Sequence, residues 1–302
     1  MADLLADRYE LTALIGRGPT GTVWRAQELR TRERLAVKIL DRELTADRHI
    51  VDRFARERPV LTAFLHKAYV RVRDLIAEEG TVALVMEYVP GSDLRATLDP
   101  AQPWAPAPAV RIALGVAEAL AAAHDAGVVH CDLKPSNLLI EERTGDVRLT
   151  DSRVGRLVRG YRQDAGRFAT PEYAAPEVIL DSPPVSATDV YALGLVLYEM
   201  LTGLMPYRDG DPDAALSRRP RAHLIVPPGV APELRHVIEA CTGAEPATRP
   251  GAAAVADELR RVLPALAALP AAGPATRDAT IAFVRYWFDL LNHAVGTGDT
   301  AP

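Results

Sequence analysis

Four polar residues with different chemistry lie close together between two apolar stretches, in the segment 128–140, which reads VVHCDLKPSNLLI. Asp132 can accept a proton, Lys134 can neutralise a developing negative charge, and Asn137 offers an amide oxygen to a metal ion. His130 is placed to orient the backbone of the same segment. This combination favours phosphoryl transfer, because catalysis of that reaction consists of positioning and charge stabilisation.

A second candidate is the glycine-rich segment 16–23, GRGPTGTV, which follows a strand-like run at 9–15. Gly16, Gly18 and Gly21 remove side chains at positions where backbone N–H groups must approach phosphates closely. On its own this pattern fits a glycine-bearing hairpin equally well. Strands are expected on both sides of the segment, and this argues against a dinucleotide-binding fingerprint, which joins a strand to a helix.

Together, these segments resemble the motifs of the eukaryotic-type protein kinases found in bacteria. The segment 128–140 is similar to the catalytic loop H-R-D-L-K-P-x-N, with Cys131 in place of the arginine, and Val23 follows the last glycine as in the kinase glycine loop. The resemblance covers a protein kinase domain at 8–262. It implies an α+β, bilobal fold with a small β-rich N-lobe (about 8–86), a hinge (87–93) and a larger helical C-lobe (94–262).

The resemblance also implies an ATP site between the lobes. Lys38, in the strand-like run 34–40, would hold the α- and β-phosphates, and Glu57 would pair with it, although Glu57 could instead be a solvated helix acid with Glu43 nearby. Met86 would be the gatekeeper of the adenine pocket. The other implied nucleotide contacts are the backbone of Glu87 and Val89 for adenine, Asp93 for the ribose, and Ile15, Val23, Ala36 and Leu139 around the purine, each of which could equally be core.

The implied catalytic roles follow the same motifs. Asp132 would orient and deprotonate the acceptor hydroxyl, and Lys134 would stabilise the transferring phosphoryl group. Asn137 and Asp151 would hold Mg²⁺ or Mn²⁺, and Thr170 would bridge Asp132 and Lys134.

Two further pairs would support the site from the C-lobe. Asp189, in the apolar helix expected at 186–203, would accept backbone N–H groups of the catalytic loop. Arg249 would pair with Glu177 in a buried ion pair, whose disruption typically costs about 3–5 kcal/mol.

Three residues depart from the family pattern: Cys131, Ser152 and Arg153. Cys131 removes the cation that normally meets a phosphorylated activation segment, and the stretch 153–169 contains no Ser or Thr, only Tyr161. We therefore expect any activity to be independent of activation-loop Ser/Thr phosphorylation. Arg153 brings positive charge beside the metal site, so we expect altered metal dependence.

The leading function is an ATP-dependent Ser/Thr protein kinase that transfers the γ-phosphate to a protein hydroxyl. The alternative is a pseudokinase, a nucleotide-binding regulatory or scaffold module, which the Ser152 and Arg153 departures motivate. A small-molecule kinase is disfavoured, because the segment 170–177 resembles a docking turn for a polypeptide substrate.

Composition sets the remaining expectations. The net charge of −5 over 302 residues gives no sign of nucleic-acid binding, and two cysteines suit a reduced, cytoplasmic protein. The N-terminus does not resemble a secretory signal, and no apolar run is expected to reach the roughly 18–20 residues needed to span a membrane. The segment 263–276 reads as an Ala/Pro-rich linker, and 277–296 as an amphipathic helix that docks on the C-lobe or contacts a dimer or other partner.

Overall fold

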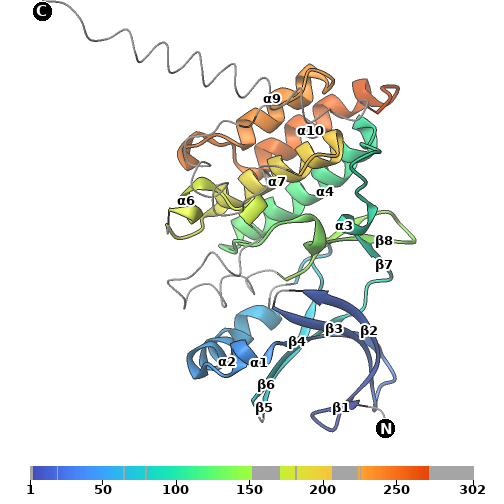
Figure 1. The fold of residues 1–302 in the computed structure, drawn as a ribbon, viewed down its shortest axis with the longest axis vertical. Coiled ribbons are helices and arrows are strands. Elements are labelled where there is room, and N and C mark those ends of the chain that lie inside the picture. The colour runs from blue at the N-terminus through green and yellow to red at the C-terminus, as the bar shows by residue number, and fades with distance from the viewer. Residues whose placement is uncertain are drawn as a thin grey trace, which may run out of the picture.

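The computed structural model describes residues 3–18, 20–63, 65–78, 80–151, 171–180, 182–205, 224 and 226–271. Within α2, the side chains of five residues, Glu57 among them, also lie outside the description. The described chain forms a small lobe built on a β-sheet and a larger lobe of helices, with α3 and a short three-stranded sheet between them (Figure 1). The bilobal α+β arrangement expected from the sequence is confirmed.

The small lobe contains one antiparallel sheet of six strands, in the order β1-β2-β3-β4-β6-β5. Helices α1 and α2 lie on one side of this sheet (Figure 1). The elements are β1 (Asp3–Leu5), β2 (Tyr9–Gly18), β3 (Gly21–Glu28), β4 (Arg34–Leu40), α1 (Arg42–Thr45), α2 (Arg48–Ala63), β5 (Val72–Glu78) and β6 (Thr81–Glu87).

Alternating burial explains why β4 places a lysine inside the molecule. Val37 and Leu35 pack on one face of the sheet with Tyr9 and Val85, whereas Leu40 packs on the other face with the fully buried Phe54 of α2. Successive strand residues point to opposite faces, so Lys38 points toward the α2 side and is buried there. A buried lysine requires a counter-charge, which makes Lys38 a functional candidate.

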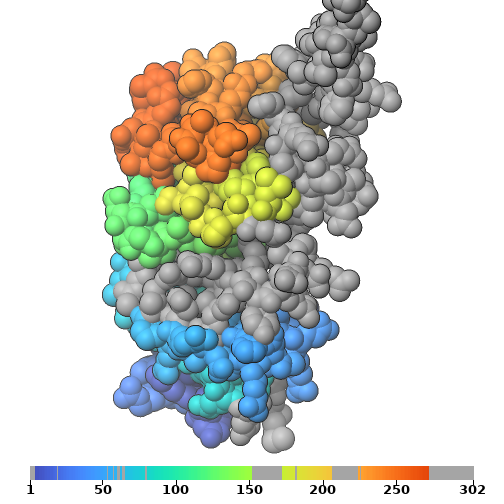
Figure 2. Space-filling model, turned by 90° about the vertical axis from the view of Figure 1, so that its left-hand side faces the viewer, coloured from blue at the N-terminus to red at the C-terminus, as the bar shows by residue number. Residues whose placement is uncertain are grey.

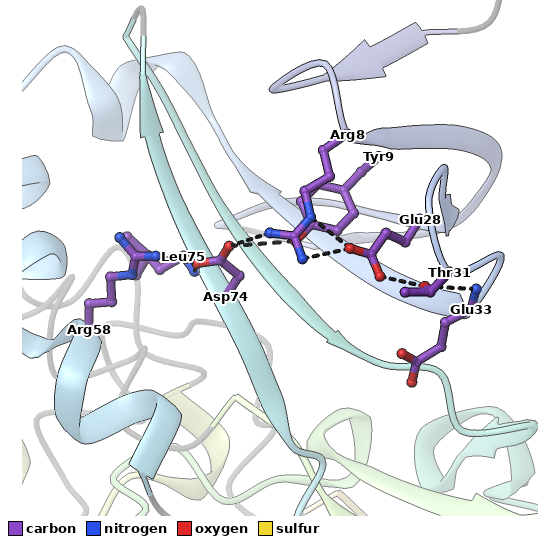
Figure 3. Close-up of polar contacts among 8 residues, drawn as sticks. All are labelled: Arg8, Tyr9, Glu28, Thr31, Glu33, Arg58, Asp74 and Leu75. Carbon is purple, nitrogen blue, oxygen red and sulfur yellow. Dashed lines mark hydrogen bonds and ion pairs between the residues drawn. The ribbon is translucent and has the colours of Figure 1, made fainter.

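A polar network runs from the other face of the sheet past the edge strand β5 to helix α2 (Figure 3). Asp74 of β5 accepts hydrogen bonds from Arg58 of α2 at 2.6 Å and from Arg8 at 3.4 Å. Arg8 also donates to Glu28 at 2.7 Å, and Thr31 donates to the other oxygen of Glu28 at 2.5 Å. Strands β2, β3 and β5 are thereby linked to helix α2 through charge.

The larger lobe is organised around two long apolar helices, α4 and α7. Helix α10 packs along α4, and α4 and α9 pack against α7. The elements are β7 (Gly91–Asp93), α3 (Leu94–Thr97), α4 (Pro106–Asp125), η1 (Pro135–Asn137), β8 (Leu138–Glu141), β9 (Val147–Leu149), η3 (Pro171–Tyr173), α6 (Pro176–Ile179), α7 (Ser186–Thr202), α9 (Pro232–Cys241), η5 (Pro246–Thr248) and α10 (Ala252–Leu266).

The space-filling view from the side of α2 shows the larger lobe above the small lobe (Figure 2). In the part of the chain that the structure describes, one helix, α4, is long and apolar enough to cross a membrane by length and composition. Its most apolar window is 61% buried inside the lobe, as is common for the core helix of a globular protein. The expectation that no run reaches this length was therefore wrong.

Interior prolines occur in α2 and α10, and the second departs from the linker expected from the sequence. Pro59 lies inside α2, and Pro264 lies inside α10, which continues to Leu266 and so includes the first residues of the segment predicted as linker. Val262 and Leu266 are almost fully buried, and this packing carries the helix past the proline. The rest of that segment from residue 272, and the predicted helix 277–296, lie outside the described residues.

Candidate active site

Asp132 lies at the centre of a compact polar group formed by the loop before β8. The ammonium group of Lys134 is 2.9 Å from its Oδ2. The amide nitrogen of Asn137 donates to the same Oδ2 at 3.1 Å and to the Asp132 backbone oxygen at 2.7 Å. The Asn137 amide nitrogen therefore faces Asp132, and its oxygen is the atom available to a metal ion. The structure brings together the three residues that the sequence singled out.

Asp189 of α7 anchors the backbone of the catalytic loop. Its carboxylate accepts the backbone N–H groups of His130 at 2.7 Å and Cys131 at 2.9 Å, which confirms the predicted role. It also bonds the His124 ring at 2.9 Å, a contact that the sequence reading missed. Cys131 has a φ of 71°, a left-handed conformation costly for a non-glycine residue, and the two charge-assisted hydrogen bonds offset that cost.

His130 connects the catalytic loop to Asp151. It is fully buried, its Nε2 lies 3.0 Å from the Thr150 oxygen, and its Nδ1 accepts the Asp132 N–H at 3.3 Å. The Thr150 N–H donates to the Asn137 backbone oxygen at 3.0 Å. Both backbone polar groups of Thr150 are thus hydrogen-bonded, and this fixes the position of the backbone that leads into Asp151. Burial lowers the pKa of His130, so the ring is neutral at neutral pH.

Lys38 reaches across from the small lobe to Asp151, with its Nζ 2.5 Å from Asp151 Oδ2. Both side chains are largely buried, with 9% and 15% of their surfaces exposed. Asp151 has a φ of 60°, a second strained residue in the site. The partner expected for Lys38 was Glu57, whose side chain lies outside the description, so that pairing stays a prediction. The observed partner is the predicted metal ligand itself.

The three glycines of the 16–23 segment differ in whether their surroundings leave room for a side chain. A Cβ on Gly21, whose φ is 146°, would lie 2.0 Å from the Ile39 oxygen of the neighbouring strand. A Cβ on Gly16 would make ordinary contact with Val23 at 3.8 Å, and one on Gly18 would meet nothing closer than 4.0 Å. Gly21 is required by strand packing, whereas a Cβ on Gly16 or Gly18 would have room.

The predicted adenine contacts lie where β4, β6 and β8 approach one another. Ala36 pairs with Met86 across the sheet, and Ala36, Val89 and Leu139 are half-buried against the same hydrophobic cluster. Val23 is half-buried, and Ile15 is 44% exposed at the glycine loop. Asp93, expected at the ribose, is the N-cap of α3 and accepts the Ala96 N–H at 2.9 Å.

The hinge residue Glu87 has an ionic partner that the sequence reading missed. Arg148 of β9 forms an ion pair with the Glu87 carboxylate and donates to the Tyr69 oxygen at 3.0 Å. The Arg71 N–H donates to the same Glu87 oxygen at 3.1 Å. The end of β6 is therefore tied to the sheet of the larger lobe. The sequence signal for this contact was a positive residue, Arg148, in the otherwise apolar strand β9, where it pairs with Leu139 of β8.

The segment 171–175, which we call the docking turn, lies beside the catalytic loop. Tyr173 and Ala174 line a pocket together with Cys131, Asp132 and Leu133. Tyr173 bonds to Glu199 of α7 and accepts a hydrogen bond from Arg95 at 2.5 Å. Burial, reinforced by the Glu199 charge, raises the pKa of Tyr173, so the phenol keeps its proton. Neither Arg95 nor Glu199 was singled out from the sequence.

Beyond the docking turn, the predicted pair of Glu177 and Arg249 is confirmed. Both carboxylate oxygens accept from the guanidinium group at 2.8 Å, and Thr188 donates to Glu177 at 2.9 Å. Burial alone would raise the pKa of Glu177, but the hydrogen bonds from Arg249 outweigh it and hold that pKa below its usual value. Ser152, Arg153 and Thr170 lie outside the described residues.

Asn137 and Asp151 fit a divalent metal ion of the magnesium type. An amide oxygen and a carboxylate are hard oxygen ligands, and Mg²⁺ is commonly held by one or two carboxylates together with water and phosphate oxygens. Within the described residues, no group of three or more His, Cys, Asp or Glu side chains forms a self-contained metal cage. The donor set therefore suits a metal ion that arrives with a nucleotide.

Comparison with known proteins agrees with this geometry. The model of the protein kinase domain family matches residues 9–259. The chain is 38% identical to the serine/threonine-protein kinase PkaB of Streptomyces coelicolor over 278 residues, covering 89% of this chain and 66% of the relative. It is 40% identical to PkaA of the same organism, covering 85% and 50%, and 33% identical to PknL of Mycobacterium tuberculosis, covering 82% and 63%.

The crystal structure of a double mutant of the Mycobacterium tuberculosis PknI kinase domain has the same fold, with a TM-score of 0.67 and 22% identity. The alignment covers 87% of this chain and 98% of that one. The chain spans about half to two thirds of the length of the curated relatives it matches. It belongs to the protein kinase domain family, among the Hanks-type Ser/Thr kinase domains of bacteria.

Proposed function

We propose that the chain is an ATP-dependent Ser/Thr protein kinase that transfers the γ-phosphate of ATP to a hydroxyl of a protein substrate. One observation carries the proposal: Lys134 and Asn137 both contact the carboxylate of Asp132, and Asp151 begins at a peptide fixed by the same loop. A general base, a phosphate-binding cation and metal ligands thereby occupy one site, as phosphoryl transfer requires.

In this mechanism, Asp132 orients the acceptor hydroxyl and takes its proton as the oxygen bonds to the γ-phosphorus. The bond from the γ-phosphorus to the bridging oxygen breaks, and ADP leaves. Lys134 stabilises the charge on the transferring group, and Lys38 binds the phosphates of the nucleotide. Asn137 and Asp151 would hold Mg²⁺ or Mn²⁺, which supplies neutralisation of phosphate charge.

Nucleotide binding requires a change at Lys38. Its ammonium group pairs with Asp151, so Lys38 would have to leave Asp151 before it could bind the phosphates. Glu57 would then receive the lysine, and Thr170 would bridge Asp132 and Lys134. The ion pair of Lys38 and Asp151 is also the observation that favours the second candidate, a pseudokinase that binds nucleotide without turnover, because it neutralises a metal ligand.

We further propose that activity does not depend on Ser/Thr phosphorylation between residues 153 and 169. Cys131 carries no charge to receive a phosphate, and its thiol donates to the Val129 oxygen at 3.4 Å. Altered metal dependence from Arg153, a cytoplasmic location and a dimer or partner contact through 277–296 remain proposals from the sequence.

The test is transfer of labelled γ-phosphate to the chain itself and to a generic basic protein. We expect Asp132→Ala to reduce transfer by about 10²–10⁴-fold, because a positioned base contributes that much, while nucleotide binding persists. The exposed Asp146→Ala is the matched control and should transfer normally. Nucleotide binding with equal, background transfer in wild type and Asp132→Ala would support the pseudokinase instead.

A further inference from the structure

A polar triad joins three elements of the larger lobe. Arg95 of α3 donates from Nη1 and Nη2 to the two carboxylate oxygens of Glu199, at 2.7 and 2.8 Å. Its Nη2 also donates to the Tyr173 hydroxyl at 2.5 Å, and that hydroxyl bonds to Glu199. One guanidinium group thus connects α3 and α7 with the docking turn.

The charges in this triad are unequal in exposure. The Glu199 side chain is 3% exposed, whereas Arg95 is 36% exposed, so its guanidinium group lies between a buried carboxylate and solvent. A buried carboxylate without its counter-charge is strongly destabilised. Removal of Arg95 would therefore leave Glu199 charged and unmatched, or force it to take up a proton. In either case the Tyr173 hydroxyl would lose its hydrogen bond from Arg95, and its other partner, Glu199, would lose its counter-charge.

Tyr173 matters because of what lies on its other side. It lines the pocket that also includes Cys131, Asp132 and Leu133 of the catalytic loop. The same pocket is closed by Thr188 and Asp189 of α7, and Asp189 holds the loop backbone. Movement of Tyr173 would alter the wall that faces the proposed base.

We propose that Arg95 is a positioning residue for the protein substrate: through Glu199 and Tyr173 it fixes the docking turn beside Asp132. The proposal rests on the proposed kinase function, because it assigns the polypeptide side of that same site. It also gives helix α3 a role in both the nucleotide site and the polypeptide site. Asp93, expected at the ribose, caps this helix, and Arg95 follows two residues later, so neighbouring residues serve the nucleotide and the polypeptide.

The first experiment measures steady-state kinetics with a generic basic protein as acceptor. We expect Arg95→Ala to raise the acceptor KM by about 10-fold or more, because loss of hydrogen bonds to a charged partner has an effect of this size, while the KM for ATP changes less than about 2-fold. Arg95→Lys should show an intermediate acceptor KM, because one ammonium group cannot reach both oxygens of Glu199 and the phenol.

A chemical rescue separates this role from general destabilisation. Millimolar guanidinium ion can occupy the place left by Arg95→Ala and neutralise Glu199, so we expect it to recover a large part of the lost acceptor affinity. Arg143→Ala, which removes an 82% exposed arginine from the same lobe, is the matched control and should neither lose affinity nor respond. An unchanged acceptor KM in Arg95→Ala would overturn the proposal.

Hydrogen exchange gives a readout that does not need activity. In Arg95→Ala, amides of residues 172–175 should exchange at least about 10-fold faster than in wild type, with guanidinium ion reversing the change, since local opening follows the lost contacts. Equal exchange in both proteins would overturn the inference even if phosphate transfer were absent. Absence of transfer in the wild type would overturn the proposed function alone.

Discussion

Two carboxylates of the site each have a lysine partner, and the pairs differ in what they do. Lys134 and Asp132 come from one loop, so their 2.9 Å contact belongs to the loop itself. Lys38 and Asp151 come from different lobes, 113 residues apart, and their contact depends on how the lobes meet. We expect the first pair to persist through the reaction and the second to break when phosphates bind.

At the residue scale, His130 should give the protein a measurable pH dependence. Its folded pKa lies below the ordinary value of about 6.5, so below that pH the unfolded chain binds a proton that the folded chain excludes. The sign follows from linkage: stability falls as pH decreases from about 6.5 toward the folded pKa, by up to about 1.4 kcal/mol per pH unit.

Urea unfolding at several pH values between about 7.5 and 5 would measure this loss. His130→Gln should flatten that part of the profile, although its stability at neutral pH will be lower. His236→Gln, at an exposed position in α9, should keep the wild-type slope. Parallel profiles for wild type and His130→Gln would mean that the ring takes up a proton in the folded state.

At the element scale, the hairpin of β2 and β3 contains one glycine that strand packing requires, Gly21, and another that it does not, Gly18. Gly21→Ala should destabilise the fold by about 2 kcal/mol or more, because the residue has a positive φ and the new Cβ would lie 2.0 Å from a backbone oxygen. Gly18→Ala should change stability by less than about 1 kcal/mol, because the added Cβ meets open space.

The same two variants test the phosphate role. If the backbone near Gly18 approaches the phosphates, Gly18→Ala should weaken ATP binding about 10-fold with little change in unfolding free energy. Calorimetric binding and urea unfolding on both variants make the comparison. Normal ATP affinity in Gly18→Ala would remove the functional reason for that glycine.

The element boundaries show what local pattern can predict. The run 34–40 was expected as a strand and is β4, and the helix expected at 186–203 is Ser186–Thr202, ended by Gly203 with a φ of 69°. Apolar periodicity and a left-handed glycine are local signals, so they can be found in sequence. Pro264 inside α10 misled the prediction, because packing against α4 outweighs the local preference.

At the scale of the whole molecule, nucleotide binding should join the lobes and stabilise both. Lys38 belongs to the small lobe, and Asn137 and Asp151 belong to the larger one. A ligand present at about 100 times its dissociation constant adds about 2.7 kcal/mol to the stability of the state that binds it. We therefore expect ATP with Mg²⁺ to raise the melting temperature by several degrees.

We expect metal binding by Asp151 to contribute part of that rise. A chelator should reduce the ATP-dependent stabilisation of the wild type, and Asp151→Asn should make the remaining stabilisation nearly independent of Mg²⁺. Asp146→Asn, a nearby exposed acid, is the control. Equal magnesium dependence in wild type and Asp151→Asn would show that Asp151 does not hold the metal.

The chemistry available to this protein can be read from the order of its residues alone. The succession of the glycine segment, Lys38, the catalytic loop and Asp189 resembles the motifs of the protein kinases, and this resemblance implied the bilobal fold and the candidate residues of the site. The confirmed pairs, Asp189 with the loop and Glu177 with Arg249, follow from those motifs.

Which charges meet one another is instead a property of the folded chain. Lys38 with Asp151, Arg148 with Glu87, and Arg95 with Glu199 join residues 113, 61 and 104 positions apart. Nothing local in the sequence specifies such pairs, because an arginine on a short helix or strand has the same pattern whether it faces water or a buried acid. Packing of the surrounding elements excludes water from these acids, and the geometry of that packing selects the partner.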